Sequence, residues 1–117
     1  MPYEDSGKNL MLDALGAAVS HASLHTADPA GTGGSEVSGG SPAYAREAIS
    51  WNTASAGVLD SSNQPVFDVP GGTTITHTGF WTAISAGTMH ASANVTDETF
   101  GGQGTYTMTD ADLDLNA

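Results

Sequence analysis

Four histidines are the side chains of this sequence best suited to binding a transition metal. His21 and His25 lie on one face of a segment whose residue types favour a strand. At roughly 3.3 Å per strand residue they are some 13 Å apart, too far to share one zinc ion. A helix would bring them together, but the H-E-x-x-H pattern is absent. His77 and His90 belong to different expected strands. We interpret these histidines as solvent-facing strand residues.

Alternating aspartates suggest a second metal chemistry at the C-terminal end. Asp110, Asp112 and Asp114 have the spacing of the first ligands in a calcium loop. An EF-hand loop also needs a glycine directly after the third acid and a glutamate six residues further on. This sequence has neither, so we predict no metal site and no cofactor.

Nucleophilic catalysis has little support in the sequence. Ser55 and Ser85 each precede Ala-Gly, but the leading glycine of a G-x-S-x-G elbow and its strand-to-helix context are missing. The glycine pairs match no phosphate-binding fingerprint. Carboxylate pairs for glycoside hydrolysis can be drawn at will from 13 acids, which makes them uninformative. We therefore predict no catalytic residue and a protein that is not an enzyme.

Large aromatic side chains could bind a sugar if they stood exposed on a sheet face. The candidates are Tyr44, Trp51, Phe80 and Trp81. In a chain this small, large aromatics are more often in the core than on the surface. Carbohydrate binding is therefore an alternative reading.

The charge of the chain excludes several classes of partner. Lys8 and Arg46 are the only basic side chains against 13 acids, and the net charge is −11. Nucleic-acid and anionic-membrane binding need clustered lysine and arginine, so neither is expected. There is no cysteine, and no signal peptide or transmembrane segment is visible, which points to assembly in a cytoplasm.

The pattern of residue types predicts one mostly β domain spanning 1–117. A helix is expected over 6–16, with Ser6 as its cap and Gly16 as its end. Period-2 alternation and β-favouring residues predict an antiparallel β-sandwich or jelly-roll-like fold. Its strands are expected near 18–26, 43–51, 55–60, 65–69, 73–82, 87–95 and 104–110.

Three segments are candidates for contacts with other subunits. The first is the N-terminal segment with Tyr3, and the second is the long Gly/Ser loop 27–42. The third is an acidic C-terminal arm, 110–117, where the alternation slips by one residue. That slip requires either a bulge or a separate segment that pairs with another sheet. The predicted interface residues are Tyr3, Asp110, Asp112, Leu113, Asp114 and Leu115.

Four consecutive segments resemble small virion proteins of tailed phages that infect actinobacteria, commonly labelled tail fibre or minor structural protein. They are KNLMLDAL (8–15), SLHTADPAGTGGSEVSGGSPAYAREAISW (23–51), QPVFDVPGGTTITHTGFW (64–81) and DETFGGQGTYTMTD (97–110). The resemblance implies a virion structural protein without catalytic residues.

Physical arguments refine that implication, because the sequence has no heptad or solenoid period that would form a fibre shaft. We expect a capsid decoration protein, assembled in the host bacterial cytoplasm, that docks on the major capsid protein or another virion protein. It is expected to form a homo-oligomer, with trimers around three-fold positions. A tail-fibre or baseplate module for host adhesion is the alternative.

Overall fold

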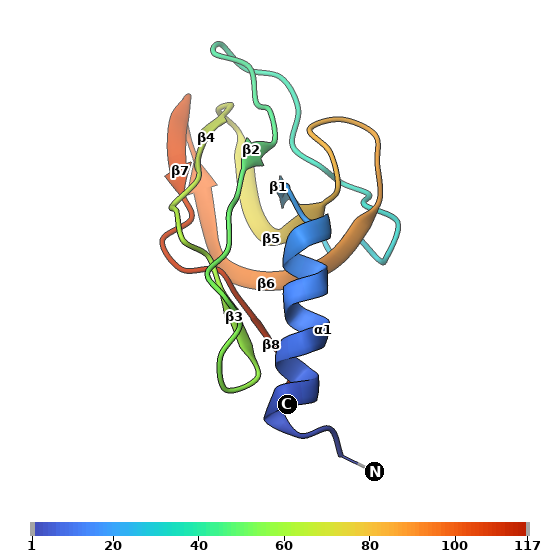
Figure 1. Cartoon of the computed structure of the whole chain (residues 1–117). Helices are drawn as coiled ribbons and strands as arrows, with labels where there is room; N and C mark the ends of the chain where they lie inside the picture. Colours follow the sequence, from blue (N-terminus) through green and yellow to red (C-terminus); the bar gives the residue numbers. More distant parts are fainter. Residues whose placement is uncertain (1, 117) are drawn as a thin grey trace.

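The computed structural model describes residues 2–116; residues 1 and 117, at the ends of the predicted domain and arm, lie outside the described range. One helix precedes a set of antiparallel strands, so the mostly β fold class with one N-terminal helix is confirmed (Figure 1). The elements are α1 (Asp5–Ala18), β1 (His21–His25), β2 (Glu47–Ala48), β3 (Val58–Asp60), β4 (Val66–Val69), β5 (Thr73–Trp81), β6 (Met89–Phe100), β7 (Gly104–Thr107) and β8 (Asp112–Asp114).

The strands form one larger sheet and two ribbons. The four-stranded sheet has the order β2-β1-β5-β6, and the two-stranded ribbons are β3-β8 and β4-β7. One core cluster joins apolar side chains of the larger sheet to those of the β4-β7 ribbon and the segment after it. Among its fully buried members are Leu24 and Ile75 from the sheet and Phe67 and Val69 from β4. The larger sheet and the β4-β7 ribbon thus share one core, and two separate ribbons stand where a sandwich would have its second sheet.

Strand β6 is long, bent and exposed along much of its length. Its register against β5 shifts twice, between Ile75 and His77 and between Phe80 and Trp81. Such bulges increase the local bend and twist of a strand, and β6 sweeps across the molecule as a curved ribbon (Figure 1). The expected alternation is kept in part, since Ala91 and Val95 pack against the core while Ser92 and Asn94 are exposed, but Ala93 is exposed as well.

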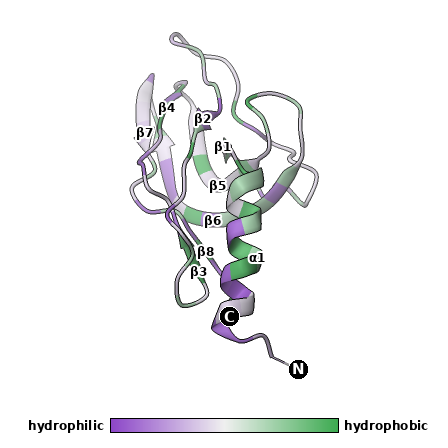
Figure 2. Ribbon diagram, viewed as in Figure 1, coloured by the Kyte–Doolittle hydropathy of each residue, from purple (hydrophilic) through white to green (hydrophobic). Residues whose placement is uncertain are grey.

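Helix α1 packs along the β3-β8 ribbon. Leu12 is buried beside Leu59, and Lys8 donates a hydrogen bond of 2.8 Å from its Nζ to the side-chain oxygen of Asn116. Figure 2 shows apolar and polar residues mixed along the helix, as expected for an element with one covered side. Among the described residues, no helix has the length and apolar character needed to span a membrane.

The predicted helix caps are wrong. The N-cap residue is Glu4, without a side-chain capping bond, and the helix continues through Gly16 to Ala18. A Cβ on Gly16 would lie 3.3 Å from Leu59 Cδ2 and 3.5 Å from Trp51 Cβ. Gly16 therefore serves close packing of the helix rather than its termination.

The loop 27–42 is held against its own sheet. Arg46 forms a bidentate ion pair with Glu36, with both N–O distances at 3.0 Å, and donates to the carbonyl oxygens of Ala83 and Ala86. Its guanidinium lies 3.5 Å from the ring centroid of Trp81. Val37, inside the loop, is buried in the core. Arg46, one of the two basic side chains, thus joins this loop to the β5–β6 connection.

Candidate functional site

A groove of about 690 Å³ lies between β6 and the segment 106–112. Strands β6 and β7 follow one another in the chain and are joined by the turn at 101–103, but they do not pair and belong to different sheets. Strand β7 pairs with β4 instead, and β8 pairs with β3. The two walls therefore splay apart, and Thr78 and Phe80 of β5 contribute to the lining between them.

The groove follows strand edges rather than a strand face. All residues from Ala93 to Glu98 line one wall, and all residues from Tyr106 to Asp112 line the other. Successive side chains of a strand point to opposite faces, so a groove over a single face would be lined by alternate residues. Consecutive lining on both sides means that two backbone edges face the groove.

Neither edge has a backbone partner across the groove. Within residues 2–116, the backbone of β6 from Ala93 to Glu98 pairs only with β5. On the opposite wall, the Met108 N–H donates to the Pro65 carbonyl and the Ala111 carbonyl accepts from the Ser61 N–H. Both of these bonds lead away from β6. The groove thus presents polar backbone groups that another strand could pair with.

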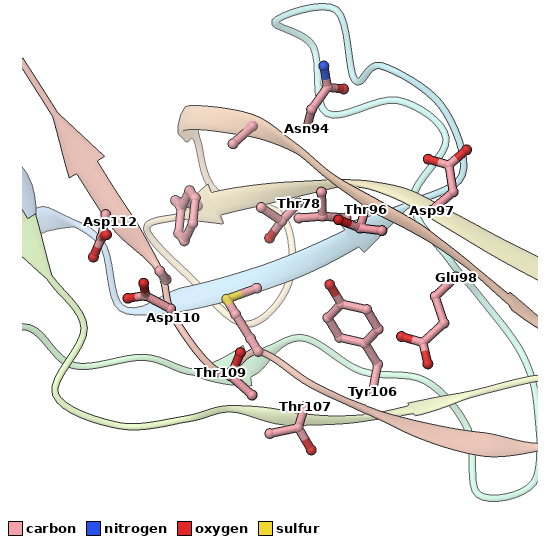
Figure 3. A pocket seen from close by; sticks show the side chains of 15 residues that line it. Thr78, Asn94, Thr96, Asp97, Glu98, Tyr106, Thr107, Thr109, Asp110 and Asp112 are labelled. Carbon is pink, nitrogen blue, oxygen red and sulfur yellow. The ribbon is translucent and has the colours of Figure 1, made fainter. Parts of the chain in front are cut away.

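Acidic side chains stand at both ends of the groove. Figure 3 shows Asp110 and Asp112 at one end and Asp97 and Glu98 at the other, with the Tyr106 ring between them. Burial raises the pKa of the Tyr106 phenol, and the negative charge of Glu98 adds to that effect. The phenol is therefore a neutral hydrogen-bonding group at neutral pH.

One end of the groove adjoins a cluster of three carboxylates. Asp60 and Asp112 are direct register partners of the β3-β8 ribbon, and a carboxylate oxygen from each lies within 4.8 Å of one from Asp110. A hydrogen bond shared with Asp60 raises the pKa of Asp112 to about 7, with burial and the charge of Asp110 adding to the shift. These three residues have the oxygen ligands to hold a hard cation, and without one the raised pKa leaves Asp112 partly protonated near pH 7.

The structure separates the six predicted interface residues. Asp110 and Asp112 line the groove, whereas Tyr3 is exposed just before α1 and lies outside it. Leu113 packs against the core of its own chain, and Asp114 accepts a hydrogen bond of 2.7 Å from the Asn116 N–H. Leu115 is 43% exposed, and its N–H donates to the Gly57 carbonyl.

The C-terminal segment therefore belongs to the fold of its own chain. The slip in alternation marks a change of pairing partner rather than a bulge. Strand β7 pairs with β4, whereas β8 pairs with β3 of the same molecule. Leu113 uses its apolar surface inside this chain, which leaves Leu115 as the exposed leucine of the segment.

The main groove residues that sequence reasoning missed lie on β6 and β7. Their residue types are ordinary for half-exposed strands, and they are Asn94, Asp97, Glu98 and Tyr106. The glycine-rich turn after Phe100 was the available signal, because it places β6 and β7 next to each other. Whether consecutive strands pair or separate depends on distant partners such as β4.

The interior holds a serine–histidine pair that the sequence did not single out. Trp81 Nε1 donates to Ser23 Oγ at 2.7 Å, and Ser23 Oγ lies 2.7 Å from His25 Nε2. His25 Nδ1 lies 2.8 Å from the Gly34 carbonyl, so it carries the proton and Ser23 donates to Nε2. Burial lowers the pKa of His25. Ser23 and His25 are both 0% exposed, so this buried relay of hydrogen bonds from Trp81 through Ser23 and His25 to Gly34 is structural. The interpretation of His25 as a solvent-facing residue is wrong.

The aromatic candidates for sugar binding belong to the core. Phe80 is buried in the core cluster, and the half-buried Tyr44 and Trp51 pack against it. Trp81 is also buried and lies under the Arg46 guanidinium. The Trp51 Nε1 donates to the Val19 carbonyl at 3.2 Å, as expected for an indole at the edge of a core. These four rings do not form an exposed stacking platform.

Comparison with known proteins places the whole fold in one family. The family model described as Podophage GP4 fiber I protein gp80 matches residues 9–115, which span the chain from within α1 to just beyond β8. Searches of curated proteins and of solved structures gave no match. The chain belongs to the Podophage GP4 fiber I protein gp80 family and is a fibre-type structural protein of a phage virion.

Proposed function

We propose that this chain is a non-enzymatic module of a phage tail fibre, whose task is attachment within the particle or to the host. The observation that carries the proposal is the fibre-family match over residues 9–115. The interior position of the Ser23–His25 pair is in keeping with a non-enzymatic role, because no substrate can reach it. The predicted actinobacterial host and cytoplasmic assembly belong to this proposal as well.

Capsid decoration is the competing function, and one observation favours it. The molecule measures 47 × 24 × 22 Å, which is compact and not itself a fibre shaft. A small acidic unit of this shape suits a protein that sits in many copies on a shell, as a trimer in contact with the major capsid protein. A fibre would instead need this module to be stacked, or joined to other proteins that provide length.

Deletion of the gene from a phage distinguishes the two functions. If the module belongs to the tail fibre, particles lacking it lose adsorption to the host while their heads keep normal resistance to heat. If it decorates the capsid, adsorption is retained and the heads release DNA at a lower temperature. The measurements are the adsorption rate and the temperature of DNA release, with complementation by the intact gene as the control.

A further inference from the structure

The groove has the form of a gap left by a missing strand. Its β6 wall runs over six residues, Ala93–Glu98, or about 20 Å at the usual rise of a strand. Both walls present backbone edges without partners across the gap. An extended peptide that enters such a gap gains main-chain hydrogen bonds, the mode called strand addition.

The charges of the groove define the segment that fits it. Four carboxylates line it, Asp97 and Glu98 at one end and Asp110 and Asp112 at the other. Opposite charge across an interface steers association and suppresses binding of wrong partners. A segment with lysine or arginine side chains complements this lining, and an acidic one is repelled by it.

A second copy of the same chain cannot provide those basic side chains. The sequence has two, and both are engaged: Lys8 is bonded to Asn116, and Arg46 is held by Glu36 and lies over Trp81. Bringing two chains of net charge −11 together at an acidic groove would add repulsion. The occupant must therefore come from a different protein.

We propose that the groove binds an extended, lysine- or arginine-bearing segment of another protein, which inserts as a strand between β6 and the wall 106–112. The backbone edges supply affinity, and the four carboxylates select for basic side chains. This inference concerns the surface of the molecule and does not depend on whether the protein sits on the tail or on the head.

A designed peptide tests the proposal on the intact chain. The probe is an end-blocked Lys-Val-Lys-Val-Lys-Val peptide, titrated by calorimetry, with amide shifts mapped by NMR. We expect saturable one-to-one binding, with shifts concentrated in 93–98 and 106–112. The same peptide with alternate backbone amides N-methylated, and a Glu-Val version, should bind at least roughly tenfold more weakly because one loses main-chain bonds and the other loses charge complementarity.

Charge-matched variants of the protein complete the test. The double variant Asp97→Asn with Glu98→Gln should weaken binding roughly tenfold, because it removes two of the four carboxylates that line the groove. Glu4→Gln with Asp5→Asn removes two carboxylates at the N-terminus of α1, outside the groove, and should leave affinity unchanged. Absence of saturable binding, or equal loss in both double variants, would overturn the proposal. So would self-association through β6 that the peptide does not displace.

Discussion

At the scale of single residues, Asp112 is the clearest site of pH dependence. Its carboxyl directly opposes Asp60, and the shared hydrogen bond raises its pKa from 3.8 to about 7. The folded chain therefore keeps a proton that the unfolded chain releases at lower pH. By linkage, Asp112 contributes most to the free energy of unfolding below its unfolded pKa, near 4. That contribution is lost as the pH rises through 7.

The substitution Asp112→Asn should remove the loss of stability at higher pH, because the amide stays neutral and its N–H can donate to the Asp60 carboxylate. The difference in unfolding free energy between variant and wild type should grow in favour of the variant from pH 5 to pH 8, as measured by urea denaturation. Asp114→Asn is the matched control, since Asp114 lies outside the carboxylate cluster. A difference that does not change with pH would contradict the raised pKa of Asp112.

The buried relay at Ser23 gives a second prediction at this scale. Ser23→Ala leaves the Trp81 N–H and the His25 Nε2 without their present partner. A buried polar group left unpaired costs about 1–3 kcal/mol, so the unfolding free energy should fall by at least that amount. Ser92→Ala, on the exposed side of β6, should change it by less than about 0.5 kcal/mol. Equal effects of the two substitutions would rule out the relay as a stabilising feature.

At the scale of elements, β8 is part of the fold rather than a free arm. Truncation after Asp110 removes Ala111 and Leu113, which pack on the core, and leaves β3 without its partner. Loss of a buried leucine side chain alone costs about 2–5 kcal/mol. The truncated chain should therefore melt at a markedly lower temperature by circular dichroism, while Leu115→Ser should melt like wild type. An unchanged melting temperature would restore the reading of a separate docking arm.

The elements also show what the sequence can and cannot predict. Strands such as β5 and β7 were predictable because alternation and residue type are local properties. The slip after Met108 left two explanations open, a bulge or a change of sheet, and the structure has the change of sheet. The identity of the partner, β3, depends on a contact across half of the chain. The groove was not predictable, because it exists only where β6 and β7 fail to pair.

The caps of α1 and the loop 27–42 illustrate the same limit. Glycine is typical of a helix end, yet the helix continues past Gly16 to Ala18. The absence of a side chain at Gly16 lets the helix pack closely against Leu59. The loop has the composition of a free segment, but the bonds of Arg46 to Glu36 fix it. Tertiary contacts override local preference in both cases.

At the scale of the whole molecule, the net charge of −11 governs self-association. Copies of one acidic chain repel each other, and salt screens that repulsion over about 8–10 Å at physiological ionic strength. If the proposed homo-oligomer forms from this chain alone, its dissociation constant should fall as salt is raised. Sedimentation velocity at low and high salt measures this, and association that weakens with salt would instead indicate an interface held by ion pairs.

The position of the protein on the particle tests the central claim most directly. The protein is a fibre-type virion protein, and its proposed place is the tail. Density for a 47 × 24 × 22 Å β-rich unit in a cryo-electron microscopy map of the particle, confirmed by gold-labelled antibody, should lie on the tail. Labelling of the head alone, with matching density at symmetric positions of the shell, would contradict the proposed tail location.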